Sequence, residues 1–214
     1  NIPGLFAAGE ADYSQHGANR LGANSLLSAV YGGTVAGPQA VKYINNLEKS
    51  SEDISSRIFD AAVKDEQKAW DDTLKMDGKE NAYVLHKELG EWMTKYVTVV
   101  RENETLQKTD DKIQELLERY NDISITDTSR WSNQGANFTR QLKNMLYLAR
   151  VITLGALKRD ESRGAHYKPA FPDRNDEEFL KTTIAEFDGE SAPIISYEEV
   201  DVSLIEPRKR DYTK

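Results

Sequence analysis

Apolar side chains recur every three or four residues through most of the chain between residues 58 and 156. Charged and polar side chains fill the positions between them, which is typical of helices that bury one face and expose the other. Such helices stabilise one another by burying their apolar stripes, so the pattern predicts an antiparallel bundle of three or four helices. The four stripes span Ile58–Leu74, Leu85–Val100, Leu106–Tyr120 and Phe138–Ala156.

The methionines and aromatic residues on these stripes are interpreted as core residues rather than as ligands of a cofactor. His86 lies on the polar side of its predicted helix and is expected at the surface. Gly90 and Gly135 fall inside predicted helices, where glycine is unfavourable, and the pattern gives no reason for either.

The N-terminal residues show a short apolar run and then a polar loop that contains glycines. The run Gly4–Gly9 is interpreted as a buried strand that ends in a tight turn. A helix is predicted to begin near Asn24 and Ser25, both favourable N-terminal caps. Pro38 predicts a bend or a restart in this helix, which then continues to Leu47.

The predicted N-terminal strand has no evident partner. A strand needs neighbouring strands to pair its backbone N–H and C=O groups. No stretch between residues 10 and 175 reads as a strand. The chain is therefore expected to be a piece of a larger protein.

The last fifty residues change character again. Residues 179–187 alternate loosely and residues 194–202 are rich in β-branched side chains, so two short strands are predicted, joined by residues 188–191. The predicted fold is thus mainly α, with a strand-loop-helix remnant of a ligand-binding domain, a helical bundle and a small C-terminal hairpin. The corresponding domains are residues 1–48, 49–162 and 163–214.

Composition excludes several classes of protein. The net charge of −8 leaves no excess of basic side chains to neutralise phosphates, so a nucleic-acid partner is not expected. The cluster Arg208-Lys209-Arg210 is expected to be a solvated tail. The absence of cysteine excludes disulfides and thiolate metal sites, and no metal ligand set is predicted. No apolar run approaches the ~18 to 20 residues that span a bilayer, and the N-terminus shows no signal-peptide pattern, so membrane association is expected only through partners.

The glycine loop before the predicted helix at Asn24 carries the clearest chemical signal. A strand, a glycine-bearing loop and a helix N-terminus together direct free backbone N–H groups at an anionic or electron-rich ligand. An ordinary junction between a strand and a helix has the same outline. The spacing alone therefore leaves both interpretations open.

Two motifs identify a resemblance. Residues 8–10 (Ala-Gly-Glu) and 16–27 (His-Gly-Ala-Asn-Arg-Leu-Gly-Ala-Asn-Ser-Leu-Leu) resemble the last FAD-binding segment of succinate dehydrogenase and fumarate reductase flavoproteins. Residues 159–167 and 171–176 resemble the C-terminal signature of the same family. The loop at residues 12–16 and the closing residues 207–212 are most similar to the menaquinone-linked bacterial branch.

The resemblance implies roles for particular residues of the loop. Glu10 corresponds to a carboxylate that holds FAD, and carboxylates accept hydrogen bonds from ribose hydroxyls. Asn24, Ser25 and Leu26 correspond to the helix start beside the flavin ring. Free N–H groups there stabilise the negative charge of a reduced flavin.

The same resemblance assigns substrate binding to Arg20 and His16. Arg20 corresponds to the arginine that clamps a carboxylate of succinate or fumarate, a task that suits a planar and permanently charged guanidinium. His16 and Asn19 are expected to support this loop or contact the flavin, and a purely loop-stabilising hydrogen bond is an equal alternative. His166 is interpreted as structural or interfacial.

Other parts of the family's active site have no counterpart in the chain. It lacks a Gly-x-Gly-x-x-Gly dinucleotide fingerprint, a histidine motif for covalent flavin attachment and the proton-transfer arginine. No catalytic residue is therefore predicted here, and the chain alone is expected neither to hold FAD tightly nor to oxidise succinate.

The resemblance implies a parent protein that oxidises succinate to fumarate and passes electrons through FAD to an iron-sulfur subunit, a membrane anchor subunit and a quinone. Such a complex lies on the cytoplasmic side of the bacterial membrane. Fumarate reductase and L-aspartate oxidase share the motifs and are alternatives. A non-catalytic helical interaction module is an alternative of another class, and it predicts that residues 1–48 are ordered within this chain alone.

Overall fold

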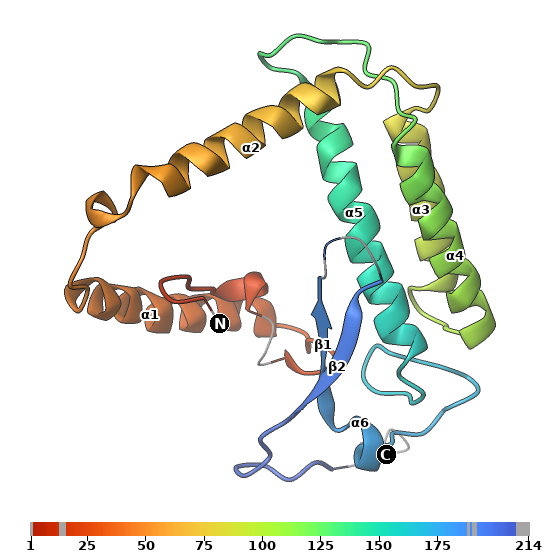
Figure 1. Cartoon of the computed structure of the whole chain (residues 1–214). Coiled ribbons are helices and arrows are strands. Elements are labelled where there is room, and N and C mark those ends of the chain that lie inside the picture. Colours follow the sequence, from red (N-terminus) through yellow and green to blue (C-terminus); the bar gives the residue numbers. More distant parts are fainter. Residues whose placement is uncertain (1, 13–15, 188, 190–191, 209–214) are drawn as a thin grey trace. The chain divides into compact units, whose positions relative to one another are not determined.

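The computed structural model describes residues 2–12, 16–187, 189 and 192–208. The chain divides into two compact units, Asn1–Lys75 and Met76–Lys214, which we call unit 1 and unit 2. Figure 1 labels their helices and strands. The domain boundaries predicted after residues 48 and 162 stay predictions.

The described residues of unit 1 form two long helices and two short ones. These are η1 (Gly9–Ala11), α1 (Asn24–Asn45), η3 (Ser51–Asp53) and α2 (Ser56–Leu74). Ser50 forms a capping box with Asp53, and this box begins η3. Helix α2 covers the first predicted stripe.

The strand predicted at Gly4–Gly9 is wrong. Residues 3 and 4 form a turn and residues 5–8 belong to no strand, although Ala8 has extended backbone angles, with φ −151° and ψ 157°. An extended segment becomes a strand only when a neighbour pairs its backbone groups, and the described part of unit 1 offers no such neighbour.

Helix α1 begins at the predicted place but with a different cap. Its N-terminal cap is Ala23, which has φ +68° and makes no side-chain cap hydrogen bond, while Asn24 is the first helical residue. The prediction of a restart at Pro38 and of an extension to Leu47 is wrong, because α1 runs without interruption to Asn45. Proline removes one N–H donor but its fixed φ suits a helix, so the bonds on either side keep α1 continuous.

Glycine lets the N-terminal segment approach α1 closely. A Cβ atom at Gly32 would lie 3.3 Å from the backbone nitrogen of Gly9 and 3.4 Å from the Cβ of Ala8. Gly9 itself has φ +70°, a conformation that side chains disfavour. The contact between η1 and α1 therefore depends on small residues on both sides.

The apolar stripe of α1 is exposed. Within α1 the only buried residue is Ser28, in a helix whose side chains are all described. The large apolar side chains on this helix expose 45% to 78% of their surface: Leu26, Leu27, Val30, Tyr31, Val35, Val41 and Ile44. Unit 1 alone therefore does not bury this stripe.

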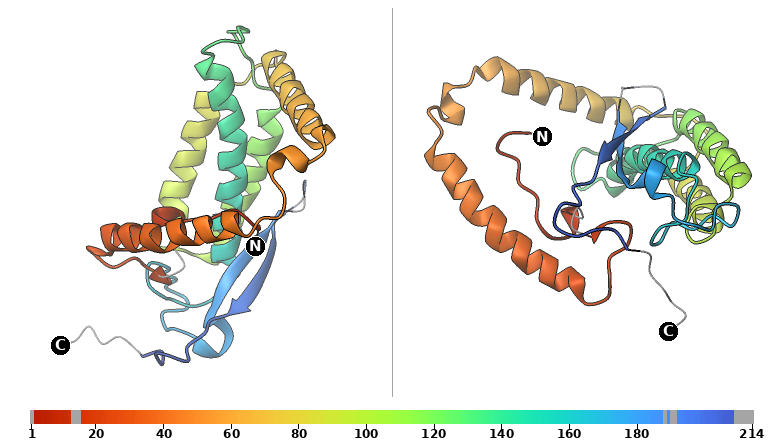
Figure 2. Two further views of the ribbon diagram at one scale, coloured as in Figure 1. Left: turned by 90° about the vertical axis from the view of Figure 1, so that its left-hand side faces the viewer. Right: turned by 90° about the horizontal axis from the view of Figure 1, so that it is seen from below.

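Unit 2 contains an antiparallel three-helix bundle of α3 (Ala82–Tyr96), α4 (Asn103–Tyr120) and α5 (Gln134–Leu157), which confirms the predicted helices. The helices run alternately down, up and down in Figure 1, and Figure 2 shows them side by side from two further directions. Their facing apolar side chains are fully buried and come from the predicted stripes: Leu85, Ile113, Leu116, Leu142 and Leu146.

Polar side chains fix the ends and the register of the bundle. Asn81 accepts hydrogen bonds from the backbone at the start of α3, and Asn133 does so for α5. Between α4 and α5, Arg150 donates from Nε to Asp110 Oδ1 at 2.8 Å, and both side chains are nearly buried. This ion pair fixes the position of α4 relative to α5 along the helix axes.

The residues that the sequence left unexplained lie at the bundle surface. His86 is exposed and meets the ring of Phe138 edge-on at 5.4 Å, as its polar position predicted. Gly90 faces open space, and a Cβ at Gly135 would lie 3.6 Å from Asn133 Oδ1. Neither glycine is required by close packing.

The C-terminal residues form α6 (Asp176–Phe179) and the predicted hairpin of β1 (Lys181–Glu186) and β2 (Ile194–Glu199). The strands are antiparallel, with Lys181 opposite Glu199 and Glu186 opposite Ile194. Of the predicted connection only Gly189 is described, and residues 188, 190 and 191 lie outside the described residues. Of the basic cluster only Arg208 is described, and its carbonyl accepts a hydrogen bond from Arg174.

Candidate functional site

All six residues predicted to bind substrate or cofactor lie in unit 1, on η1, the loop after it and the first turn of α1. Glu10 is exposed on η1. The turn that carries it closes with a hydrogen bond from Asp12 N to Gly9 O at 3.0 Å. A Cβ at Gly9 would lie 3.5 Å from the Cβ of Ala29, so this turn is seated on α1.

His16 fixes a second point of the loop on the same helix. Its Nε2 lies 3.2 Å from the Oγ of Ser28. Ser28 Oγ donates its own proton to the carbonyl of Ser25 at 2.9 Å. The structure thus contains the loop-stabilising bond that the sequence offered as an alternative for His16, and it leaves the Nδ1 atom uncommitted within the described residues.

Arg20 is exposed and bears no ion pair with a described carboxylate. Its Nη1 donates to the carbonyl of the next residue, Leu21, at 3.3 Å. A guanidinium has five N–H donors, so most of them stay available for an anion. Asn19 is likewise exposed, beside Arg20.

The first turn of α1 offers free backbone donors. The cap residue Ala23 provides no side-chain acceptor, and the N–H of Asn24 bonds only to the carbonyl of Leu21, at 3.3 Å. The N–H groups of Ser25 and Leu26 have no intrahelical partner, because they lie in the first helical turn. Both residues are exposed, so this helix end can accept an electron-rich ligand.

The loop therefore has three chemical parts: a carboxylate at Glu10, cationic and imidazole groups at Arg20 and His16, and the N-terminus of α1. The close packing of Gly9 on Ala29 and the contact of His16 with Ser28 join the loop to the first half of that helix. The ligand contacts of each residue stay predictions. The described residues contain no group of three histidine, cysteine or acidic side chains placed to hold a metal ion.

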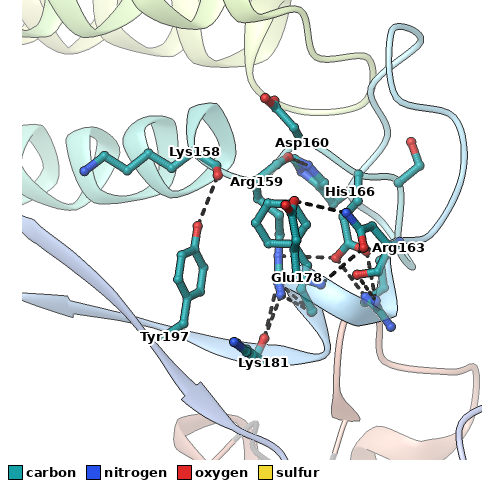
Figure 3. Close-up of polar contacts among 12 residues, drawn as sticks. Lys158, Arg159, Asp160, Arg163, His166, Glu178, Lys181 and Tyr197 are labelled. Carbon is teal, nitrogen blue, oxygen red and sulfur yellow. Dashed lines mark hydrogen bonds and ion pairs between the residues drawn. The ribbon is translucent and has the colours of Figure 1, made fainter.

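A second polar cluster lies in unit 2, and Figure 3 shows part of it. Arg159, at the end of α5, donates to the carbonyls of Phe179 and Lys181 at 2.7 and 2.6 Å. The hydroxyl of Tyr197 donates to the carbonyl of Lys158 at 3.1 Å. These bonds attach the hairpin to the end of the bundle, and the guanidinium lies 5.4 Å from the ring centre of Phe179.

Two charged side chains of this cluster are almost completely buried. Glu161 accepts two hydrogen bonds from Arg163, both of 2.8 Å, and one from the backbone of Asn175. Lys168 donates from Nζ to the carbonyl of Leu157 at 2.9 Å and to Asp160 at 2.8 Å. Burial lowers the pKa of Lys168, and Asp160 opposes that shift.

His166 belongs to the same cluster, and its predicted structural or interfacial role stays a prediction. Its Nε2 donates to the carbonyl of Arg159 at 2.8 Å, so its Nδ1 is the acceptor facing Arg101 Nη1 at 2.6 Å. Burial lowers the pKa of His166; the bond to the Arg159 carbonyl opposes this, whereas the cations of Arg101, Lys168 and Arg159 lower it further. A neutral imidazole is thus built into this junction.

The sequence did not reveal how these groups would pair. The signal available was a dense run of charged residues without helical spacing, from Arg159 to Lys168. An open groove of about 480 Å³ borders the cluster, between Arg101, Asn103, Lys168 and Phe171. It contains none of the predicted ligand-binding residues, and the charged side chains of Lys168, Asp160, Glu161 and Arg163 beside it are paired.

Comparison with known proteins shows which family this chain is similar to. The family of the C-terminal part of fumarate reductase flavoproteins matches residues 86–212. The succinate dehydrogenase flavoprotein subunit of Bacillus subtilis is 70% identical over 215 aligned positions, which cover 100% of this chain and 37% of that protein.

Solved structures agree in fold. A mutant of the Escherichia coli quinol fumarate reductase subunit FrdA superposes with a TM-score of 0.88 at 36% identity, covering 97% of this chain and 35% of that one. Mycobacterium smegmatis Sdh1 in complex with UQ1 gives a TM-score of 0.82 at 30% identity, covering 96% and 34%. The chain thus spans about a third of the length of these relatives.

Proposed function

This chain belongs to the family of succinate dehydrogenase and fumarate reductase flavoproteins, and from that we propose that it forms the C-terminal part of a flavoprotein subunit that oxidises succinate to fumarate. The observation that carries the proposal is the 70% identity to a succinate dehydrogenase subunit along the whole chain. That identity includes unit 1, where the predicted ligand-binding residues lie.

The residues of the loop fit FAD as the cofactor. When bound, FAD would accept a hydride, and with it two electrons, from succinate, while the second hydrogen would leave as a proton to a base that is not predicted within this chain. The exposed carboxylate of Glu10 is suited to accept hydrogen bonds from ribose hydroxyls. The free N–H groups of Ser25 and Leu26, at the positive end of α1, are suited to an electron-rich ring edge, and Asn24 is the first residue of that helix.

Substrate binding is assigned to Arg20 and His16. An exposed guanidinium without a described ion-pair partner can bind a carboxylate through two parallel hydrogen bonds. His16 lies four residues earlier and is attached to α1 through Ser28. Together they would hold a dicarboxylate beside the first turn of α1.

The exposed stripe of α1 supports a larger protein around unit 1. Side chains such as Leu26, Leu27 and Val30 expose two thirds or more of their surface. Contiguous apolar surface of this kind is covered by other protein in a stable structure. The relatives are nearly three times longer than this chain, so the rest of the flavoprotein is the proposed cover.

The proposed partners are an iron-sulfur subunit and a membrane anchor subunit that carry the electrons to a quinone. None of the helices among the described residues has the length and apolar character that crossing a membrane requires. The proposed location is the cytoplasmic face of the bacterial membrane, with attachment through those partners. Fumarate reductase is the second candidate, because the E. coli fumarate reductase subunit has the same fold at 36% identity.

The test is succinate-dependent dye reduction by the complete flavoprotein with Arg20→Lys. Lysine keeps the charge but loses the paired donors, so the rate at low succinate should fall at least about tenfold, the loss of one charge-assisted hydrogen bond. FAD content should stay unchanged. Arg57→Lys is the matched control, since Arg57 is an exposed arginine on α2. Near-normal activity of Arg20→Lys would refute the carboxylate clamp.

A further inference from the structure

Ser28 is a buried polar residue on α1, a helix whose large apolar side chains are exposed. It is a polar residue with 7% exposure, whereas the apolar Leu27 beside it is 67% exposed. The face of α1 that carries Ser28 is therefore the face on which the loop lies. His16 is the loop residue that contacts it.

The two hydrogen bonds of Ser28 determine which ring nitrogen of His16 carries a proton. Ser28 Oγ has one proton and donates it to the carbonyl of Ser25, at 2.9 Å. Its lone pairs remain, so the contact of 3.2 Å with His16 Nε2 requires that Nε2–H be the donor. Ser28 is thus not a nucleophile activated by His16, because the proton of Ser28 is committed to the helix backbone.

The bond to the helix backbone alone does not explain the burial. Thr34 makes the same kind of bond on the same helix, from Oγ1 to the carbonyl of Tyr31 at 2.7 Å. Thr34 is exposed and contacts no imidazole among the described residues. The distinguishing feature of Ser28 is its contact with His16.

We propose that Ser28 is a positioning residue for substrate binding, which acts by holding His16 through Nε2 and presenting Nδ1 to a carboxylate of the substrate. The proposal rests on the function proposed above. A carboxylate oxygen only accepts hydrogen bonds, so Nδ1 meets it as a donor in the doubly protonated imidazolium. In that form Nε2–H still donates to Ser28 Oγ, and Arg20, four residues further along, supplies the guanidinium for the same dicarboxylate.

The experiment is a double-mutant cycle in the complete flavoprotein, with KM and kcat measured for succinate. Ser28→Ala should raise KM about fivefold, as expected for one lost hydrogen bond, with little change in kcat. In a His16→Gln background, Ser28→Ala should cause no further increase. Ser28→Thr keeps the hydroxyl and should keep the KM of the wild type, and Thr34→Ala is the control that should change neither constant.

Three outcomes would overturn the proposal: an unchanged KM in Ser28→Ala, an equal effect of Ser28→Ala with and without His16, or a KM in Ser28→Thr as high as in Ser28→Ala. Each variant is compared at equal FAD content, so that loss of folded protein is not counted as a change in KM. If the wild type oxidises no succinate, the proposed function falls and this inference with it. If the wild type is active and Arg20→Lys is impaired, any of these three outcomes refutes the positioning role of Ser28 and leaves the proposed function standing.

Discussion

The ion pair between Asp110 and Arg150 provides a sharp test of how unit 2 is held together. Asp110 is 3% exposed, and Arg150 donates to both of its carboxylate oxygens, at 2.8 and 3.4 Å. Arg150→Met removes the partner and leaves a buried carboxylate that keeps only the hydrogen bond from Gln114. Removing one member of a buried pair costs about 3–5 kcal/mol of unfolding free energy.

This loss is large compared with the total stability of a domain, which is about 5–15 kcal/mol. For a unit of this size it corresponds to a decrease of roughly 10–20 °C in Tm. The double variant Asp110→Leu with Arg150→Met should recover most of the loss, because no charge then stays buried without a partner. The measurement is denaturant unfolding followed by circular dichroism at 222 nm.

The control lies on the same helix. Lys108 pairs with Glu104 at the surface of α4 at 2.6 Å, and both side chains are mostly exposed. Lys108→Met should leave the stability essentially unchanged, since water screens such pairs. A loss below about 1 kcal/mol in Arg150→Met, or a double variant as unstable as the single one, would show that this pair does not set the packing of α4 on α5.

Two further predictions concern unit 2. The folded state depresses the pKa of His166. As the pH falls through the ordinary histidine pKa near 6.5, the unfolded chain therefore binds a proton before the folded chain does. The free energy of unfolding should be fully present above that pH and decline below it. Denaturant titrations between pH 7.5 and 5.5 should show a smaller decline in His166→Gln, and an equal decline would refute the role of the neutral imidazole that faces Arg101. Gly78→Ala should destabilise the unit by more than about 2 kcal/mol, because the new Cβ would lie 1.9 Å from the carbonyl oxygen of Asp122. The Cβ added by Gly90→Ala meets no atom within 4 Å, so this variant should stabilise α3 by about 0.5–1 kcal/mol in the same unfolding assay. A Gly90→Ala variant less stable than Gly78→Ala would contradict this packing.

The helices of unit 2 were predictable because their apolar stripes are buried within the chain itself. Leu85, Ile113 and Leu142 belong to apolar stripes with helical spacing on three different helices and meet in one core. The same rule found α1 but could not say what covers its stripe. Periodicity shows which face of a helix is apolar, but it does not show which surface covers that face.

The errors have a related cause. The segment Gly4–Gly9 has strand-like composition, but a strand is defined by pairing, which no local pattern encodes. The cap of α1 was missed because Ala23 ends the loop through its backbone angle and not through a side chain. Asn24 and Ser25 have the right chemistry for a cap and occupy helical positions instead.

The site was predictable only in part. The roles proposed for Glu10, Arg20 and the start of α1 rest on a resemblance to a family, and the structure adds how the loop is attached. The contact between His16 and Ser28 was not visible in the sequence, because twelve residues and a loop separate them. Likewise, Glu161 and Lys168 have the composition of surface residues, and only the pairing of their charges explains their complete burial.

The exposed stripe of α1 has a consequence for the order in which the protein acquires its structure. Unit 2 has a core of helices that follow one another in the sequence, and such local contacts favour rapid, independent folding. Unit 1 has no comparable core among its described residues, so the persistence of α1 depends on surfaces supplied from outside unit 1. Since the loop with Arg20 and His16 is attached to α1, we expect the proposed ligand-binding loop to become ordered only together with the surface that covers α1.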